Sequence, residues 1–408
     1  MRCPAGRACL AAVAVVLART PVAAEVAAKV DVIAGGSLAV ETRVFTQPPA
    51  FPRQDRAGFS PSLVIEPELR LEWNDGFDYL TLIPFARLDA HDDERTHADV
   101  REASWTHLAE DYDLVLGISK VFWGVAESRH LVDVINQTDL VEDIDQEDKL
   151  GQPMASLTVL RDWGALTGFV LPGFRLRTFP GDDARLRGPL PVAADEGRFE
   201  SDLGQGHVDL AFRYAGTFGD IDLGLAHFFG TGREPRLLPE VRGGRTRLVP
   251  HYDLVHQTAI DLQATRGAWL WKGEAIFRAG QGEPFLATVA GFEHTRFGVL
   301  DTALDLGLLA EVHLDGRDDA APPTVFDHDL FLGSRLAFND VQGSEILAGV
   351  VVDWETGAMA WNLEAERRIG ERYRIEVTLR AFANVPDEDL LAGIRKDDYL
   401  EVRLARFF

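Results

Sequence analysis

The chain has 408 residues, with 41 lysines and arginines against 65 aspartates and glutamates, and a formal net charge of −24 at pH 7. A nucleic-acid-binding protein needs clustered basic residues, so this charge excludes that class. Beyond residue 24 there is no run of 18 apolar residues, which excludes a membrane-spanning helix there.

The first 24 residues have the features of an export signal. Arg2 and Arg7 supply a positive start, residues 9–18 a short apolar core, and residues 22–24 a small-residue cleavage site. The core is about half the length of roughly 20 residues that a membrane anchor requires. We therefore expect a single mature domain over residues 25–408, with a charge of −27 and without Cys3 and Cys9, hence without disulfides.

The mature sequence repeats segments in which apolar and polar residues alternate. In residues 62–73 every second position is mostly apolar, and the polar positions include Glu68, Arg70 and Glu72. A period of two places the two sets on opposite faces of a strand. Residues 207–214, 358–366 and 373–381 alternate in the same way. A soluble β-sandwich would also alternate, so this pattern alone leaves both folds open.

Counting these segments predicts 18 strands, with 16 as the alternative and both chain ends in the periplasm. They lie near residues 34–46, 61–73, 77–88, 100–109, 112–119, 154–162, 164–178, 205–215, 219–229, 252–265, 268–279, 284–295, 298–313, 326–338, 344–353, 357–368, 371–383 and 397–408. A closed barrel of 16–18 strands encloses a lumen wide enough for water.

Loop lengths and aromatic residues favour an all-β transmembrane antiparallel barrel over the sandwich. Short turns alternate with long polar connections near 47–60, 89–99, 120–153, 179–204, 230–250, 314–325 and 384–397, although two further connections of the long set, near 280–284 and 353–357, are short. Short periplasmic turns and long external loops are typical of outer-membrane barrels. Aromatic residues near strand ends suit two interfacial girdles, and they include Trp73, Phe77, Tyr79, Trp105, Trp269, Trp271 and Tyr399.

The C-terminal strand ends in an aromatic residue. Leu400, Val402, Leu404 and Phe408 share one face, which Arg406 interrupts. This end resembles the terminal strand that outer-membrane proteins present to the barrel-assembly machinery, and the resemblance implies an assembly signal at Phe408. We expect the protein in the outer membrane of a Gram-negative bacterium, in contact with lipid and lipopolysaccharide.

The connection at 120–153 is the most informative part of the sequence. It combines eight acids and three bases with large apolar residues, among them Phe122, Trp123, Leu131 and Ile135. A purely solvated loop rarely carries so many apolar residues. We expect it to fold into the lumen, with its apolar side on the wall, and to narrow the channel. The alternative is an external cap over the barrel.

The same region resembles a family of proteobacterial porin-like barrels of unknown function. The family has a Gly-Arg-Gln strand end, a Trp-Gly pair and an Asp/Asn-Val-Ile-Asn-Pro-x-Asp segment. Gly117, Trp123-Gly124, Val134-Ile135-Asn136 and Asp139 match it, whereas Ser119-Lys120 replace Arg-Gln and Gln137 replaces the proline. The resemblance covers about 40 residues and implies an outer-membrane barrel linked to transport, with no known substrate.

Arginines on the polar faces of predicted strands complete the candidate site. An acidic constriction that faces arginines would create a transverse field that selects solutes, although the same charges could simply pair with one another and hydrate the wall. The predicted constriction and solute-binding residues are Lys120, Glu127, Arg129, Asp133, Asp139, Glu142, Asp143, Asp145, Arg70, Arg175 and Arg177.

Other features add little chemistry. His91 and His97 lie among acids in residues 89–99, which favours a solvated acidic loop over a metal site. No catalytic or nucleotide-binding motif is present, so we expect no enzyme activity, metal or cofactor. The sequence thus favours a channel for small solutes. An export outlet for a polymer or lipid, working with a periplasmic partner, is the alternative, and an outer-membrane enzyme is a distant third; homo-oligomerisation stays open.

Overall fold

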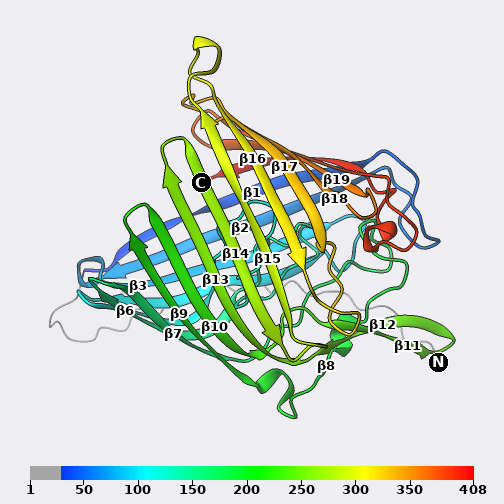
Figure 1. Ribbon diagram of the computed structural model, residues 1–408, viewed down its shortest axis with the longest axis horizontal. Helices are drawn as coiled ribbons and strands as arrows, with labels where there is room; N and C mark the ends of the chain where they lie inside the picture. Colours follow the sequence, from blue (N-terminus) through cyan, green and yellow to red (C-terminus); the bar gives the residue numbers. More distant parts are fainter. Residues whose placement is uncertain (1–28) are drawn as a thin grey trace, which may run out of the picture.

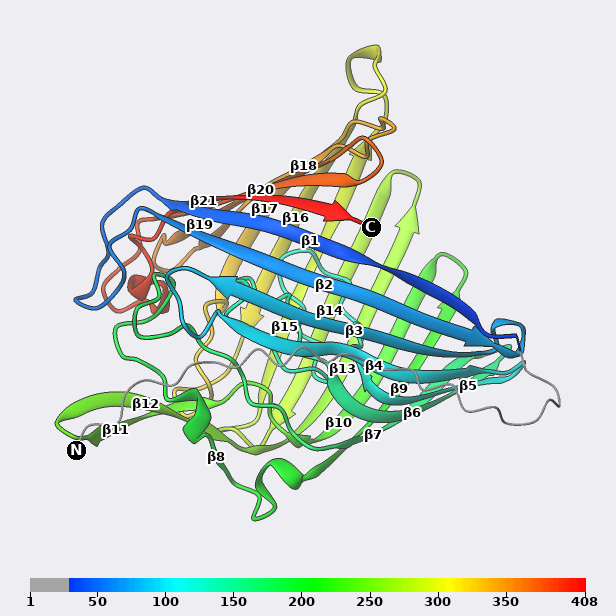
Figure 2. The same cartoon turned by 180° about the vertical axis from the view of Figure 1, so that it is seen from behind.

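The computed structural model describes residues 29–408, in which 18 strands form one antiparallel sheet that closes into a barrel (Figures 1 and 2). Consecutive barrel strands pair with each other, and β1 (Asp31–Phe45) pairs with β21 (Tyr399–Phe407) to close the ring. The predicted fold and its 18 strands are confirmed. The expected signal, Cys3 and Cys9 lie outside the described residues, in which no helix is long and apolar enough to cross a membrane.

The remaining barrel strands follow the predicted order closely. They are β2 (Phe59–Trp73), β3 (Asp78–Asp89), β4 (His97–Leu108), β5 (Tyr112–Ser119), β6 (Gln152–Arg161), β7 (Gly164–Pro172), β9 (Val208–Phe218), β10 (Ile221–Thr231), β13 (Leu254–Arg266), β14 (Trp269–Ala279), β15 (Phe285–Arg296), β16 (Asp305–Asp315), β17 (His328–Ala337), β18 (Glu345–Asp353), β19 (Met359–Ile369) and β20 (Tyr373–Ala383). The short connections contain 3-10 turns such as η1 (Asn74–Gly76) and η4 (Val299–Asp301).

Two strand boundaries differ from the prediction by more than three residues. The strand expected at 164–178 ends at Pro172, and the one expected from 298 begins only at Asp305. In the second case Leu300 and Asp301 have positive φ values of 58° and 57°, so the chain turns there instead of extending. The alternation of apolar and polar residues in the sequence does not predict this turn.

A second, small sheet lies outside the barrel and was not predicted. It consists of β11 (Arg236–Arg242), β12 (Arg245–Tyr252) and the short β8 (Arg198–Phe199), and it projects from one end of the barrel (Figure 1). Gly243 and Gly244 both have positive φ in the turn of this hairpin. A Gly-Gly pair between two short runs is a known hairpin signal, so the sequence did contain the information.

The two faces of the barrel strands differ in chemistry. On the outer face large apolar side chains are exposed, such as Val40 at 55% and Phe277 at 52%, as expected for contact with lipid. The next residues along the same strands point to the inner face: Glu41, after Val40, is 3% exposed, and Ile276, before Phe277, is 1% exposed. The predicted aromatic girdle is wrong at two positions. Tyr399 faces inward at 1% exposure, and its ring lies 5.8 Å from that of Phe45. Tyr79 lies on the same face of β3 as buried Thr81.

Candidate functional site

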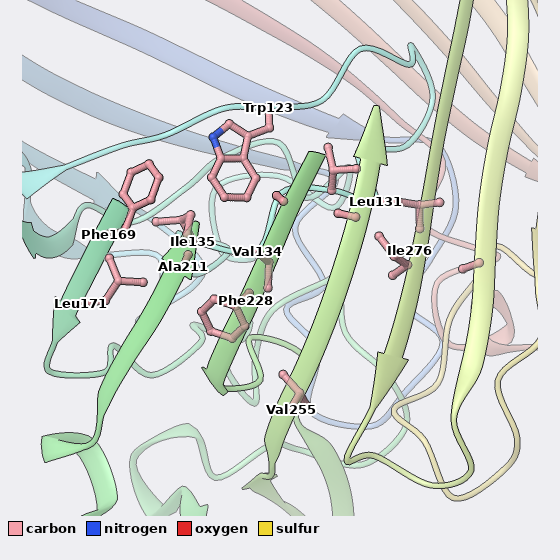
Figure 3. Close-up of a cluster of buried hydrophobic side chains, with 14 of the residues drawn as sticks. Trp123, Leu131, Val134, Ile135, Phe169, Leu171, Ala211, Phe228, Val255 and Ile276 are labelled. Atoms are coloured by element: carbon pink, nitrogen blue, oxygen red, sulfur yellow. The ribbon is translucent and has the colours of Figure 1, made fainter. Parts of the chain in front are cut away.

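The connection between β5 and β6, residues 120–151, is called here the inner segment. Its buried side chains Trp123, Leu131, Val134 and Ile135 form one apolar cluster with wall residues of β6, β7, β9, β10 and β13–β15 (Figure 3). These wall residues, which include Phe169, Leu171, Phe228 and Ile276, are on the inner faces of their strands. The inner segment therefore lies against one half of the wall, on its lumen side.

Two wall carboxylates hold the backbone of the inner segment. Glu274 on β14 accepts hydrogen bonds from the backbone N–H groups of Val125 (2.6 Å), Ala126 (2.9 Å) and Val132 (3.2 Å). Glu311 on β16 accepts from the N–H groups at 127 and 128, at 2.7 and 2.9 Å. An irregular segment has no regular partners for its buried N–H groups, so these carboxylates satisfy them.

Asn136 and Asp133 organise the inner segment from within. The Asn136 side chain accepts from Val121 N–H at 2.8 Å and donates to the carbonyls of Ser119 and Leu150, each at 2.9 Å. These bonds join the two ends of the segment. Asp133 accepts from the N–H groups of Trp123 and Gly124, at 2.7 and 3.1 Å, which makes it a structural residue. Apart from Gly117 on β5, the residues that carry the family resemblance thus lie in the packed part of the segment.

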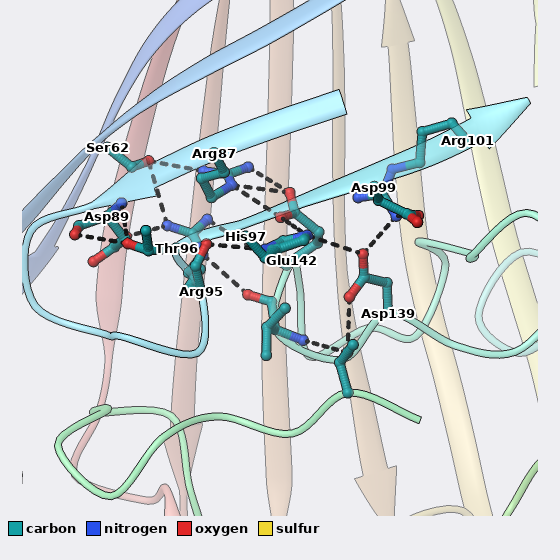
Figure 4. Close-up of polar contacts among 12 residues, drawn as sticks. Ser62, Arg87, Asp89, Arg95, Thr96, His97, Asp99, Arg101, Asp139 and Glu142 are labelled. Carbon is teal, nitrogen blue, oxygen red and sulfur yellow. Dashed lines mark hydrogen bonds and ion pairs between the residues drawn. The ribbon is translucent and has the colours of Figure 1, made fainter. Parts of the chain in front are cut away.

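A buried ionic cluster anchors the inner segment to β3 and β4 (Figure 4). Asp139 contacts Arg101 at 2.6 Å and accepts from the Thr178 hydroxyl at 2.7 Å. Glu142 accepts two hydrogen bonds from Nε of Arg87, at 3.0 and 3.1 Å. Arg87 also pairs with Glu41 at 2.8 Å.

The environment of Asp139 favours its ionised form. Burial alone would raise its pKa, but hydrogen bonding to His97 and the Arg101 charge lower the pKa of Asp139 to about 2. Because Asp139 is fully buried and doubly hydrogen-bonded, it is an anchor of the segment and is closed to direct contact with water.

Other predicted site residues make exposed or half-buried contacts around the segment. Glu127 pairs with Arg335 at 2.7 Å and Lys272 at 3.2 Å. Arg380 contacts both Asp145 (2.7 Å) and Asp143 (3.3 Å).

Four of the five basic residues in the predicted set lie in or beside the inner segment, and the fifth, Arg70, does not. Arg129 pairs with Asp315 at 2.9 Å, Arg175 pairs with Asp99 at 2.6 Å, and Arg177 donates to Gln146 at 2.9 Å. Lys120 is exposed at the start of the segment. Arg70 lies elsewhere: it pairs with Glu72 at 2.6 Å and stacks on Tyr79, next to the turn at 74–77.

The residues that sequence reasoning missed are mainly the partners of the inner segment. Glu41, Arg87, Arg101, Glu274 and Glu311 are buried on inner strand faces, and Arg95 is buried in the connection between β3 and β4. The period-two pattern identifies the five strand residues as inward-facing. Nothing in that pattern says which of the many inward charges meets the segment, because the contacts join strands far apart in sequence.

The inner segment borders two water-accessible volumes of opposite charge. One of about 650 Å³ lies between the segment and the wall formed by β1–β4 and β17–β21, and is lined by thirteen carboxylates and seven basic side chains. The other, of about 240 Å³, lies on the side of β14 and the loops after β10 and β16, and is lined by six lysine and arginine side chains and four carboxylates. We call them the acidic volume and the basic cavity.

Comparison with solved structures shows that other β-barrel proteins share this fold. The chain is similar to a BenF-like porin from Pseudomonas fluorescens Pf-5, with a TM-score of 0.53 and 10% identity over 93% of this chain and 98% of that one. It is also similar to OpdO of Pseudomonas aeruginosa, with a TM-score of 0.51 and 13% identity over 92% and 96% of the two chains.

A third similar structure comes from a protein with a different role. It is Wzi of Escherichia coli, an outer-membrane carbohydrate-binding β-barrel involved in group 1 capsule assembly, with a TM-score of 0.51 and 9% identity over 90% of this chain and 83% of that one. No protein-family model matches the sequence, and no curated protein matches it. At these identities the similarities establish the fold.

Proposed function

We propose that the protein is a porin-like outer-membrane channel for small solutes and that the inner segment is its constriction. The main support for this proposal is that the segment packs on one half of the wall and faces the other half across the acidic volume. Its apolar side chains cover the β6–β15 half of the wall, and several of its acids border the acidic volume on the other half. A fixed segment of this kind reduces the open cross-section and leaves a polar path beside it.

The charge balance along this path supports a preference for cations. Thirteen carboxylates face seven basic groups around the acidic volume. Charges 4 Å apart interact by about 1 kcal/mol in bulk water and more beside a low-dielectric wall. The excess of carboxylates should therefore raise the local concentration of cationic solutes.

The surface supports the proposed location. The exposed apolar outer face suits a bilayer, and the C-terminal Phe408 suits recognition by the barrel-assembly machinery. Long connections such as 384–398 and the β11–β12 hairpin are on the side where lipopolysaccharide would be met if the short turns are periplasmic. The fold needs no cofactor for passive passage.

Three exposed acids of the segment provide the test. The variant D145N/E147Q/D148N removes negative charge beside the path and leaves the buried anchors intact. We expect the preference for K⁺ over Cl⁻, measured as reversal potential in planar bilayers under a salt gradient, to fall about two- to fivefold. Asp139 and Glu142 are kept, because their loss would strand buried Arg101 and Arg87 at a cost of about 3–5 kcal/mol each.

The matched control removes three exposed acids from loops and turns that do not line either volume. The variant D202N/E371Q/E388Q changes the same formal charge, and its selectivity should equal that of the unmodified protein. Equal shifts in both variants would mean that only the overall charge matters. An unchanged reversal potential in the segment variant would show that solutes do not pass beside the segment.

A further inference from the structure

The basic cavity contrasts with the rest of this acidic protein. Its six basic side chains are Arg129, Lys149, Arg177, Arg233, Arg278 and Arg317, and they outnumber the cavity's carboxylates by two in a chain whose net charge is −24. Such an accumulation requires compensation, because buried like charges repel one another strongly.

Four of these six bases already have carboxylate partners. Arg278 and Arg317 contact Glu234 at 2.6 and 3.4 Å. Arg129 contacts Asp315 at 2.9 Å, and Arg233 contacts Asp209 at 2.7 Å through one of its two terminal nitrogens. Lys149 and Arg177 have no carboxylate within 4.0 Å among residues 29–408. Lys149 donates only to neutral oxygens, those of Thr138 (3.2 Å) and Gln146 (2.7 Å).

Two guanidinium groups also keep unused donors inside the cavity wall. Arg177 and Arg233 are only 9% and 7% exposed, yet Nε of Arg177 and Nη2 of Arg233 have no hydrogen-bond partner. Leaving a buried charged donor unsatisfied is unfavourable, because the donor has lost its water and gained no acceptor in exchange. Burial and the nearby Arg177 lower the pKa of Lys149, partly offset by Asp133, so the site is electrostatically strained as it stands.

The three residues belong to three different connections. Lys149 is in the inner segment, Arg177 in the connection after β7, and Arg233 in the connection after β10. Gln146 links the first two, because its side chain accepts from Arg177 and its carbonyl from Lys149. A ligand held by all three would fasten the inner segment to the connections after β7 and β10.

We propose that the basic cavity binds a small oxyanion, a phosphate or a carboxylate, between Lys149, Arg177 and Arg233, and that this anion clamps the inner segment in place. The oxyanion supplies the acceptors that the unused guanidinium donors lack, and charge-assisted hydrogen bonds of this kind are the strong ones. The effect on conductance rests on the proposed channel function, whereas the binding itself does not.

Isothermal titration of the full-length protein in detergent, at constant chloride, tests the binding. Inorganic phosphate and acetate are titrated separately, and we expect at least one of them to bind at a single saturable site. Arg177→Gln should weaken that binding by about tenfold or more. The matched control is Arg403→Gln, which removes an arginine from the acidic volume and should leave the affinity unchanged.

Each outcome decides the proposal. Binding of phosphate alone or of acetate alone would identify the anion class, and both results support the site. Absence of saturable binding by either, or equal weakening in the two arginine variants, would overturn it. If Arg177→Gln does not fold, Lys149→Gln replaces it with the same expected loss. Conductance without anion binding would reject the anion clamp and leave the proposed channel function intact. Anion binding without conductance would reject the channel function and leave the clamp intact.

Discussion

At the scale of single residues, acids that look alike in the sequence have different roles in the structure. Asp139 is fully buried against Arg101 and anchors the inner segment, whereas Asp148, nine residues later, is exposed beside the acidic volume. The sequence predicted that this region carries charge inward. It could not separate anchors from lining residues, because the deciding partners come from β3, β4 and the connection after β7.

The ionised form of Asp139 should make the anchoring of the segment sensitive to acid. Its pKa falls from 3.8 to about 2 on folding, so its contribution of about 2 kcal/mol is complete above pH 4 and is lost as the pH falls to about 2. Pepsin, which is active over this range, should cut within residues 120–151 faster at pH 2 than at pH 4.

The matched variants separate this effect from general acid unfolding. Asp139→Asn should already be cut fast at pH 4, because its amide cannot replace the charge that faces Arg101. Asp148→Asn should behave like the unmodified protein. If Asp139→Asn and the unmodified protein show the same dependence on pH, Asp139 does not anchor the segment through its charge.

At the scale of elements, the strands were predictable and the connections were only partly so. A period of two over about ten residues specifies a strand and its lumen face, and β5 was predicted to the residue. The inner segment has no regular period, so only its composition indicated that it needs an apolar surface. The β11–β12 hairpin was missed because its arginine-rich runs look like a solvated loop.

The tethers on β14 and β16 should control how firmly the inner segment is held. Glu274→Gln replaces a charged acceptor of three backbone N–H groups with a neutral amide, which we expect to cost about 1–3 kcal/mol of docking energy. Single-channel recordings should then show more open-state noise. Glu72→Gln on β2, whose carboxylate contacts Arg70 and lines neither volume, is the control and should record like the unmodified protein.

At the scale of the whole molecule, closure depends on the seam between β1 and β21. Phe408 donates its N–H to the carbonyl of Gly36 at 3.1 Å, and its ring lies over that glycine. Gly36 has a φ of 147°, and a Cβ there would lie 2.6 Å from Cα of Pro67, so only glycine fits. The sequence predicted a role in assembly for the terminal aromatic residue, which stays a prediction, and its contact with Gly36 follows only from closure.

Deletion of Phe408 should reduce the amount of folded protein in the outer membrane, because the last contact across the seam and the terminal aromatic residue are both lost. The measurement is the fraction that migrates as the compact, heat-modifiable form on gels without boiling. Deletion of Leu390 from the connection at 384–398 is a control of equal length. Equal folded fractions for the Phe408 deletion and the unmodified protein would exclude this role.

The apolar cluster beneath the inner segment also implies an order of events during folding. Phe169, Phe228 and Ile276 face the interior of the barrel, so on a barrel without the docked segment they would face water. Each such side chain contributes about 1.5–3 kcal/mol when it is covered. The apolar surface on which the segment docks exists only after β6 to β15 have paired. Docking must therefore come late, and until then the inside of the nascent barrel exposes an apolar surface to water.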